Sequence, residues 1–162
     1  MKRPEPYAVP GTPEHAALIA QLRSVRAAAA AHKPLIIEIP IETRSEANTH
    51  EHWRGRANRA VHQRTSVRVS LYEADFGGIR KHRPLVVVLT RISPRELDSD
   101  NLVGAMKAPR DGVADFLGSD DRNPEIAWHV TQTRGVAGVR VLVRPRDARD
   151  DAFDVALRAV IG

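Results

Sequence analysis

Pro84–Ile92, with the sequence PLVVVLTRI, is the most hydrophobic stretch of this 162-residue chain. Its valines and leucines lack the polar alternation of a half-exposed strand, which is typical of a strand buried on both faces. We therefore expect this stretch to be a central strand of a β-sheet. The chain then passes through Ser93–Leu97 to the acidic motif DSDN at 98–101, so carboxylates follow the strand directly.

The sequence after this motif predicts a helix from about Asn101 to Gly118. Gly118 is a typical helix C-cap. Pro109 lacks the N–H group that a helix interior needs, so a kink or break is expected near residues 107–110. The buried stripe of this helix consists of apolar residues at helical spacing: Leu102, Met106, Val113, Phe116 and Leu117.

Two further strands, Ile126–Thr131 and Gly138–Val143, are expected to pair as a hairpin around Gly135. Upstream of the central strand, Leu35–Ile41 alternates between apolar and other residues, as a half-buried strand does. A helix from near residue 50 to about residue 71 is expected between these two strands, because its apolar residues recur with a 3.6-residue period, although Val67, Val69 and Leu71 fit a strand equally well. Thr12, Pro13 and Glu14 have the pattern of the start of another helix, which runs to about residue 32.

These elements predict an α+β fold for residues 34–145, with helices packed on a mixed sheet of about four strands in the order β-α-β-α-β-β. Residues 1–33 are predicted to be an appended arm and helix, and residues 146–162 a tail or short helix. The chain has no cysteine, which excludes disulfides and thiolate metal sites. The apolar runs are too short to span a bilayer and the N-terminus lacks an apolar signal core, so we expect a cytoplasmic protein without a membrane partner.

Charge is distributed unevenly along the chain. The net charge of +5 and the pI near 10.2 indicate a nucleic-acid partner, although a GC-rich genome also produces arginine-rich proteins. Residues 44–83 have a local charge of +5, whereas residues 96–125 carry eight acids against three basic residues. An acidic cluster beside a basic belt suits a metal-dependent enzyme that acts on a polyanion. The candidates for phosphate contacts are five arginines of the second predicted helix: Arg54, Arg56, Arg59, Arg64 and Arg68.

The paired aspartates have two interpretations. In the first, Asp98 and Asp100 cap a helix, and Asp120 and Asp121 belong to a turn. Capping needs only one acid, however, and two aspartates at i and i+2 repel each other unless a cation, a lysine or the helix dipole intervenes. In the second interpretation, oxygens from Asp98, Asp100 and one aspartate of the later pair meet around Mg2+, a hard cation that keeps several waters.

The motif DSDN, a following helix that bears a lysine, and the later LGSDD resemble the RusA-like Holliday-junction resolvases. The resemblance covers roughly Leu35–Val143 in the order of the elements. It implies a small homodimeric endonuclease that cuts branched DNA with Mg2+, or with Mn2+ in its place. It also implies that Asp98, Asp100 and Asp121 bind the metal, with Asp120 beside it.

The lysine of that family lies one turn after the second aspartate, where this sequence has Gly104. We assign its role to Lys107, because Lys107 and Asp111 keep the four-residue spacing of the family's lysine and the aspartate that follows it. The predicted function is therefore a Mg2+-dependent, structure-selective endonuclease of recombination or repair. Asp98, Asp100, Asp121 and Lys107 are its predicted catalytic residues.

Two alternatives remain open. One is a non-enzymatic phage or prophage DNA-binding protein on the same scaffold, with a degenerate metal site. The other is a small interaction protein whose acids only cap helices and turns. Binding and nicking of branched DNA separate the three interpretations.

Overall fold

The structure is a computed structural model. It describes residues 12, 13, 16, 17, 20, 33–45, 52–120 and 122–147. The chain divides into two compact units: Lys33–Arg146, and the two ends of the chain, Met1–His32 with Asp147–Gly162. All strands and helices described below belong to Lys33–Arg146.

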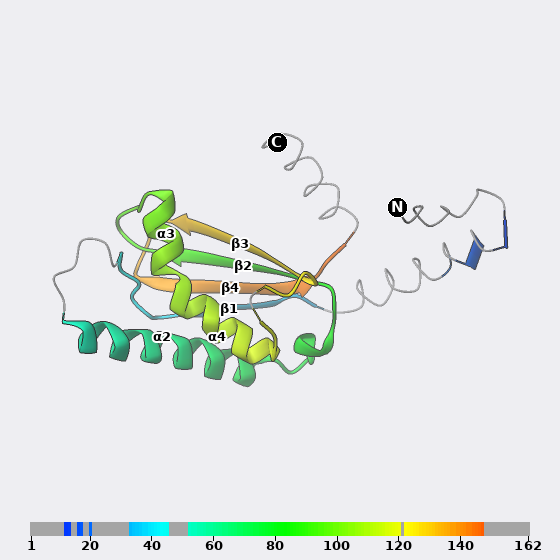
Figure 1. Cartoon of the computed structure of the whole chain (residues 1–162), viewed down its shortest axis with the longest axis horizontal. Helices are drawn as coiled ribbons and strands as arrows, with labels where there is room; N and C mark the ends of the chain where they lie inside the picture. Colours follow the sequence, from blue (N-terminus) through cyan, green and yellow to red (C-terminus); the bar gives the residue numbers. More distant parts are fainter. Residues whose placement is uncertain are drawn as a thin grey trace, which may run out of the picture. The chain divides into compact units, whose positions relative to one another are not determined.

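Four strands form one mixed sheet in the order β1-β4-β2-β3 (Figure 1). Strand β3 runs parallel to β2, whereas β4 is antiparallel to both β1 and β2. The predicted α+β class with a mixed four-stranded sheet is therefore confirmed. The strands are β1 (Leu35–Ile39), β2 (Leu85–Ile92), β3 (Ile126–Thr133) and β4 (Gly138–Pro145).

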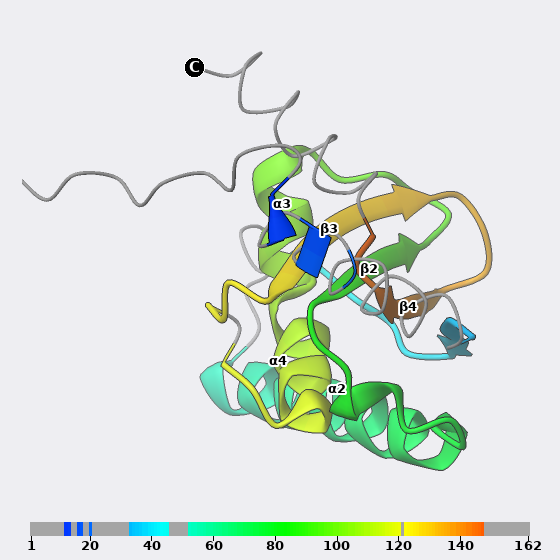
Figure 2. The same ribbon diagram turned by 90° about the vertical axis from the view of Figure 1, so that its right-hand side faces the viewer.

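Three helices pack on one face of this sheet (Figure 1, Figure 2). Alternate residues of β2 point toward the helices, and Leu85, Val87 and Leu89 belong to one core cluster with residues from all three helices. β2 is buried along most of its length, as predicted for a central strand. The helices are α2 (Trp53–Ala74), α3 (Ser99–Ala105) and α4 (Lys107–Leu117), and a 3-10 turn, η1 (Ile79–Lys81), precedes β2 in the chain.

The predicted hairpin of the last two strands is wrong. Strand β2 lies between β3 and β4 and pairs with both, so that Ile92 is opposite Thr133 on one side and Gly138 on the other. The connection at 134–137 must therefore cross the end of β2. A Cβ atom on Gly135 would lie 2.8 Å from the Ile92 side chain, so the crossing needs a residue without one. Local sequence cannot reveal this, because nothing in the two strands marks a third strand between them.

The helix expected at residues 101–118 is divided in two at Met106, whose φ of −96° and ψ of 2° end α3 and begin α4. The break lies one residue before the predicted range. Pro109 is thus in the first turn of α4, where N–H groups have no partner within the helix and proline is tolerated. Gly118 ends α4 with a left-handed φ of 61°, as its predicted C-cap role requires.

Helices α2 and α4 lie in close contact. Arg64 donates to the two carboxylate oxygens of Asp115 at 2.6 and 2.7 Å. The Arg64 guanidinium holds the pKa of Asp115 below its usual value. A Cβ atom on Gly112 would lie 2.5 Å from the Arg64 carbonyl oxygen and 3.0 Å from the Cβ of Val67. The two helices are therefore too close at Gly112 to admit any side chain there.

Several predicted elements fall largely outside the described residues. They include most of the N-terminal helix, the start of the second helix near His50, and the tail from residue 148. At the start of the N-terminal helix, the Ala16 N–H donates to the Thr12 carbonyl at 3.0 Å, as expected of a helical turn. In the described part of the chain, no helix is both long enough and apolar enough to cross a bilayer.

Candidate functional site

Asp98 lies beyond the carboxyl end of β2, where the chain enters α3 (Figure 1). The residue before it, Leu97, is held by Gln132 near the end of β3. Gln132 Oε1 accepts from the Leu97 N–H at 2.9 Å, and Gln132 Nε2 donates to the Leu97 carbonyl at 2.6 Å. This pair of bonds fixes the backbone that leads into the acidic motif against the edge of the sheet.

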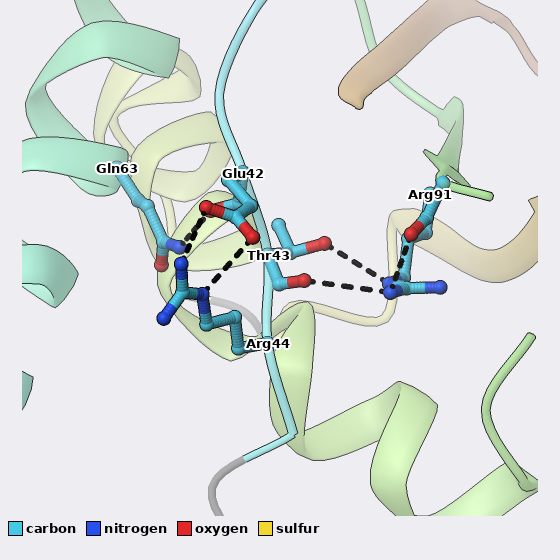
Figure 3. Close-up of polar contacts among 6 residues, drawn as sticks. Glu42, Thr43, Arg44, Gln63 and Arg91 are labelled. Atoms are coloured by element: carbon cyan, nitrogen blue, oxygen red, sulfur yellow. Dashed lines mark hydrogen bonds and ion pairs between the residues drawn. The ribbon is translucent and has the colours of Figure 1, made fainter. Parts of the chain in front are cut away.

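Arg91 joins the segments around the same end of the sheet. Arg91 is only 5% exposed, and its guanidinium donates to Thr43 Oγ1 at 3.1 Å and to the Arg95 carbonyl at 2.7 Å. Burial lowers the pKa of Arg91 from its ordinary value. Figure 3 shows Thr43 between Arg91 on one side and Gln63 of α2 on the other. Arg91 thus fixes the continuation of β1 to the segment that leads to α3.

Asp98 is the N-cap of α3. Its Oδ1 accepts from the Asn101 N–H at 2.9 Å and its Oδ2 accepts from Asn101 Nδ2 at 2.8 Å. These bonds lower the pKa of Asp98 from its usual value. The Ser45 hydroxyl bonds Asn101 Oδ1, which leaves the Asn101 amide hydrogens directed at Asp98. Asp98 therefore caps α3, as the first interpretation predicts. Each of its carboxylate oxygens accepts one of these bonds and retains a lone pair that can bind a cation.

Asp100 lies in the first turn of α3 and is exposed. Its side chain forms no hydrogen bond or ion pair with the residues that the structure describes. The cap of α3 is already supplied by Asp98. The second acid of the motif is thus available to a ligand.

Lys107 is the first residue of α4, and its Nζ donates to Asp111 Oδ2 at 3.0 Å. Both residues and Gly104 line a hollow of about 370 Å³ between α2 and the junction of α3 with α4. Gly104, Lys107 and Asp111 therefore border the same hollow, whereas Asp100 is not among the residues that line it.

Asp120 lies toward the opposite end of the sheet from Asp98. It follows the C-terminus of α4 and precedes Ile126, which pairs with Leu85 at the start of β2. Its Oδ1 accepts from the Arg122 N–H at 2.8 Å, which is the geometry of a turn. The eight residues of β2 extend about 25 Å, so one chain does not bring Asp120 to the acidic motif after β2.

Asp121 lies outside the described residues, so its predicted role as a metal ligand stays a prediction. Within residues 33–45, 52–120 and 122–147, no three histidine, aspartate or glutamate side chains are grouped closely enough to hold a metal ion. Asp98 and Asp100 lie two residues apart at the start of α3.

The five predicted DNA-contacting arginines do not form one continuous surface. Arg64 is bound to Asp115, and the pKa of Asp115 is lowered by Arg68 as well. Arg64 therefore serves the contact of α2 with α4. Near the start of α2, the Arg54 guanidinium lies 5.3 Å from the centre of the Trp53 ring.

Arg56 and Arg59 lie on the other flank of α2. Arg56 lines the hollow beside α3 and α4, and the charge of Arg59 lowers the pKa of Glu42 after the larger effect of Arg44. The outward face of α2 carries no lysine or arginine over most of its length. It is a shallow surface formed by Asn58, Val61, His62, Thr65, Ser66 and Val69.

The sequence did not predict three side chains that position the backbone around the acidic motif: Ser45, Arg91 and Gln132. Their partners lie 56, 48 and 35 positions away in the chain, so no local spacing marks them. Arg91 alone has a sequence signal. It continues the inward-facing series of Leu85, Val87 and Leu89, and a charged residue at such a position needs buried polar partners.

A comparison of the sequence with protein-family models and with curated proteins finds no match.

Proposed function

We propose that this protein is a Mg2+-dependent endonuclease that cuts branched DNA, including four-way junctions, in the cytoplasm. The observation that supports the proposal most directly is Asp100, an exposed carboxylate without a partner in the described chain, two residues after the capped Asp98. Two acids at this spacing repel each other unless a cation compensates them. Binding a divalent cation gives the second acid a role that capping does not.

The donor set fits Mg2+. Asp98 and Asp100 offer hard oxygen ligands, and protein sites often hold this ion through one or two carboxylates, completed by waters and substrate phosphates. When bound, the ion would neutralise the phosphodiester and activate water for in-line attack. Lys107, with its side chain 75% exposed, can turn from Asp111 toward a phosphate oxygen and stabilise the charge that develops there.

The resemblance to the RusA-like family implies a third metal-binding aspartate, from the pair Asp120 and Asp121. Asp120 lies toward the far end of the sheet from the acidic motif of the same chain. A site with three aspartates therefore requires the acid pair of a second copy, which the proposed homodimer would provide. A site with two aspartates needs no second copy.

Mixing two inactive variants distinguishes these possibilities. We expect Asp100→Asn and Asp121→Asn each to lack Mg2+-dependent nicking. In a 1:1 mixture of exchanging dimers, about a quarter of the sites would receive intact residues from both chains, so nicking should return to about that fraction. The measurement is nicking of a labelled junction by each variant alone and by the mixture. An inactive mixture, with subunit exchange shown by differently tagged copies, would mean that the third acid does not come from a partner.

A gel experiment tests the proposal itself. The wild-type chain is incubated with a labelled four-way junction or a linear duplex, in Mg2+, in Mn2+ or in EDTA. We expect preferential binding of the junction in all three conditions and nicks only with a divalent metal. Binding without nicks in either metal indicates the non-enzymatic DNA-binding protein. Absence of binding to either DNA excludes both DNA-binding interpretations and leaves the small interaction protein.

The runner-up, a DNA-binding protein without nuclease activity, has its own support. Asp98 caps α3 and Asp120 forms a turn, so both have structural roles. The positive end of the helix dipole also compensates part of the charge of Asp100. Gly104 occupies the position at which the resemblance would place the lysine. If Asp98 and Asp120 have only these structural roles, the protein would bind branched DNA without cutting it.

A further inference from the structure

The hollow between α2 and the α3–α4 junction is lined by basic side chains from three segments of the chain. Arg44 comes from the continuation of β1, Arg56 from α2 and Lys107 from α4. Asp111 is the one acidic residue among those that line it. Nothing in the proposed metal chemistry at Asp98 and Asp100 uses Arg44 or Arg56.

Small residues leave room at the base of this hollow, whose volume is about 370 Å³. The junction of α3 with α4 at Met106 forms part of its wall. A wall without bulky side chains, surrounded by cationic groups, favours an anion. The small lining residues are Ala57, Ala60, Gly104, Ala105 and Ala108.

Two of the basic groups around the hollow, Arg44 and Lys107, have carboxylate partners that an incoming anion can replace. Arg44 donates to the two oxygens of Glu42 at 3.0 and 2.9 Å, and both side chains are more than half exposed, at 55% and 58%. Lys107 is 75% exposed where it meets Asp111. Such exposed pairs are weak. Arg59 also acts on the charge of Glu42.

We propose that this hollow binds a phosphate group of the DNA backbone, one that neighbours the bond to be cut rather than the bond itself. The guanidinium groups of Arg44 and Arg56 match phosphate with paired N–H donors. The inference rests on the proposed function for its ligand, since it takes DNA as the source of the phosphate. It assigns Arg44 and Arg56 a role in holding the substrate and leaves catalysis to the acidic motif and Lys107.

The test measures junction binding by the full chain in EDTA, where no cutting occurs. Arg56→Ala should weaken the affinity about tenfold and lower the salt dependence by about one released counterion. Asp111→Asn should tighten binding about 3- to 10-fold, because it removes the competing carboxylate and releases Lys107. Lys33→Ala, which removes one exposed charge before β1, is the matched control and should change affinity less than twofold. Thermal melting of each variant checks that the fold is retained.

The gain of affinity in Asp111→Asn is decisive, because a damaged fold does not produce it. Unchanged or weaker binding by this variant, with wild-type melting, overturns the proposal. A parallel titration with inorganic phosphate distinguishes a second source of the ligand. If free phosphate binds through Arg56 while junction affinity is unchanged in every variant, the hollow is a small-anion site and not a DNA subsite. These binding measurements are independent of nicking. The endonuclease proposal can therefore fail while the phosphate site is confirmed, and the phosphate site can fail while the endonuclease proposal is confirmed.

Discussion

Asp100→Asn is expected to reduce Mg2+-dependent nicking of a four-way junction by at least about 100-fold, while binding of the junction survives or tightens. Asp100 is exposed, caps nothing and has no partner in the described chain, so the change should cost little stability. It removes a charged oxygen ligand from the proposed ion and a negative charge that repels phosphate. Nicking rates at saturating DNA and Kd values in EDTA are the two measurements needed.

Asp98 provides the controls for this experiment. Asparagine is as good an N-cap as aspartate, so Asp98→Asn should keep α3 intact while it removes the second charged ligand. Asp98→Ala should remove both the cap and the ligand, at about 1 kcal/mol of stability. If Asp98→Asn and Asp100→Asn both nick at the wild-type rate, the acids are structural and the nuclease proposal fails. If nicking and binding fall together, the motif maintains the fold rather than the metal.

Gly112→Ala is expected to destabilise the domain by about 1–2 kcal/mol, or to lower Tm by roughly 3–8 °C. The added methyl group would lie 2.5 Å from the Arg64 carbonyl oxygen and 3.0 Å from the Cβ of Val67. A backbone carbonyl cannot rotate away as the tip of a long side chain can. α2 and α4 must therefore separate, which weakens the bond of Arg64 to Asp115 and the core beneath. Thermal and urea unfolding measure the loss.

Gly104→Ala is the matched control, because it is the same change in a neighbouring helix. No atom lies within 4 Å of a Cβ atom placed there. Alanine in a helix is better than glycine by about 0.5–1 kcal/mol, so this variant should be as stable as the wild type or more stable. Equal behaviour of the two variants would contradict the close contact of α2 and α4. Gly104→Lys, which places a lysine where the resemblance expects one, can be built on the same open position.

The sequence was sufficient for those parts of the fold that local patterns encode. Pro84–Ile92 is apolar except for Thr90 and Arg91 and became β2, since a strand flanked on both edges and covered by helices needs mostly apolar side chains. Gly118 ended α4 because the left-handed backbone there strongly favours glycine. Pro109 required a helix to begin or break near it, and the break came at Met106. The α+β class followed from these elements together.

The candidate site depended on more than local pattern. The DSDN motif showed by itself that acids follow a strand and begin a helix, and Asp98 indeed caps α3. Whether Asp120 lies near it depends on the direction in which α4 runs, and α4 leads the chain back toward the start of β2. The arginines of α2 were predicted as one surface, but Arg64 belongs to the contact with α4 and Arg56 to the hollow.

By itself, the sequence determined the elements, their class and the chemical character of the acidic motif, because hydrophobic periodicity, caps and helix breakers act over a few residues. Only the tertiary structure decided that β4 lies between β1 and β2, that Asp98 and Asp120 belong to opposite ends of the sheet, and that Arg44, Arg56 and Lys107 meet. Each of these facts depends on how strands pair and helices pack across tens of residues. No short-range pattern carries that information.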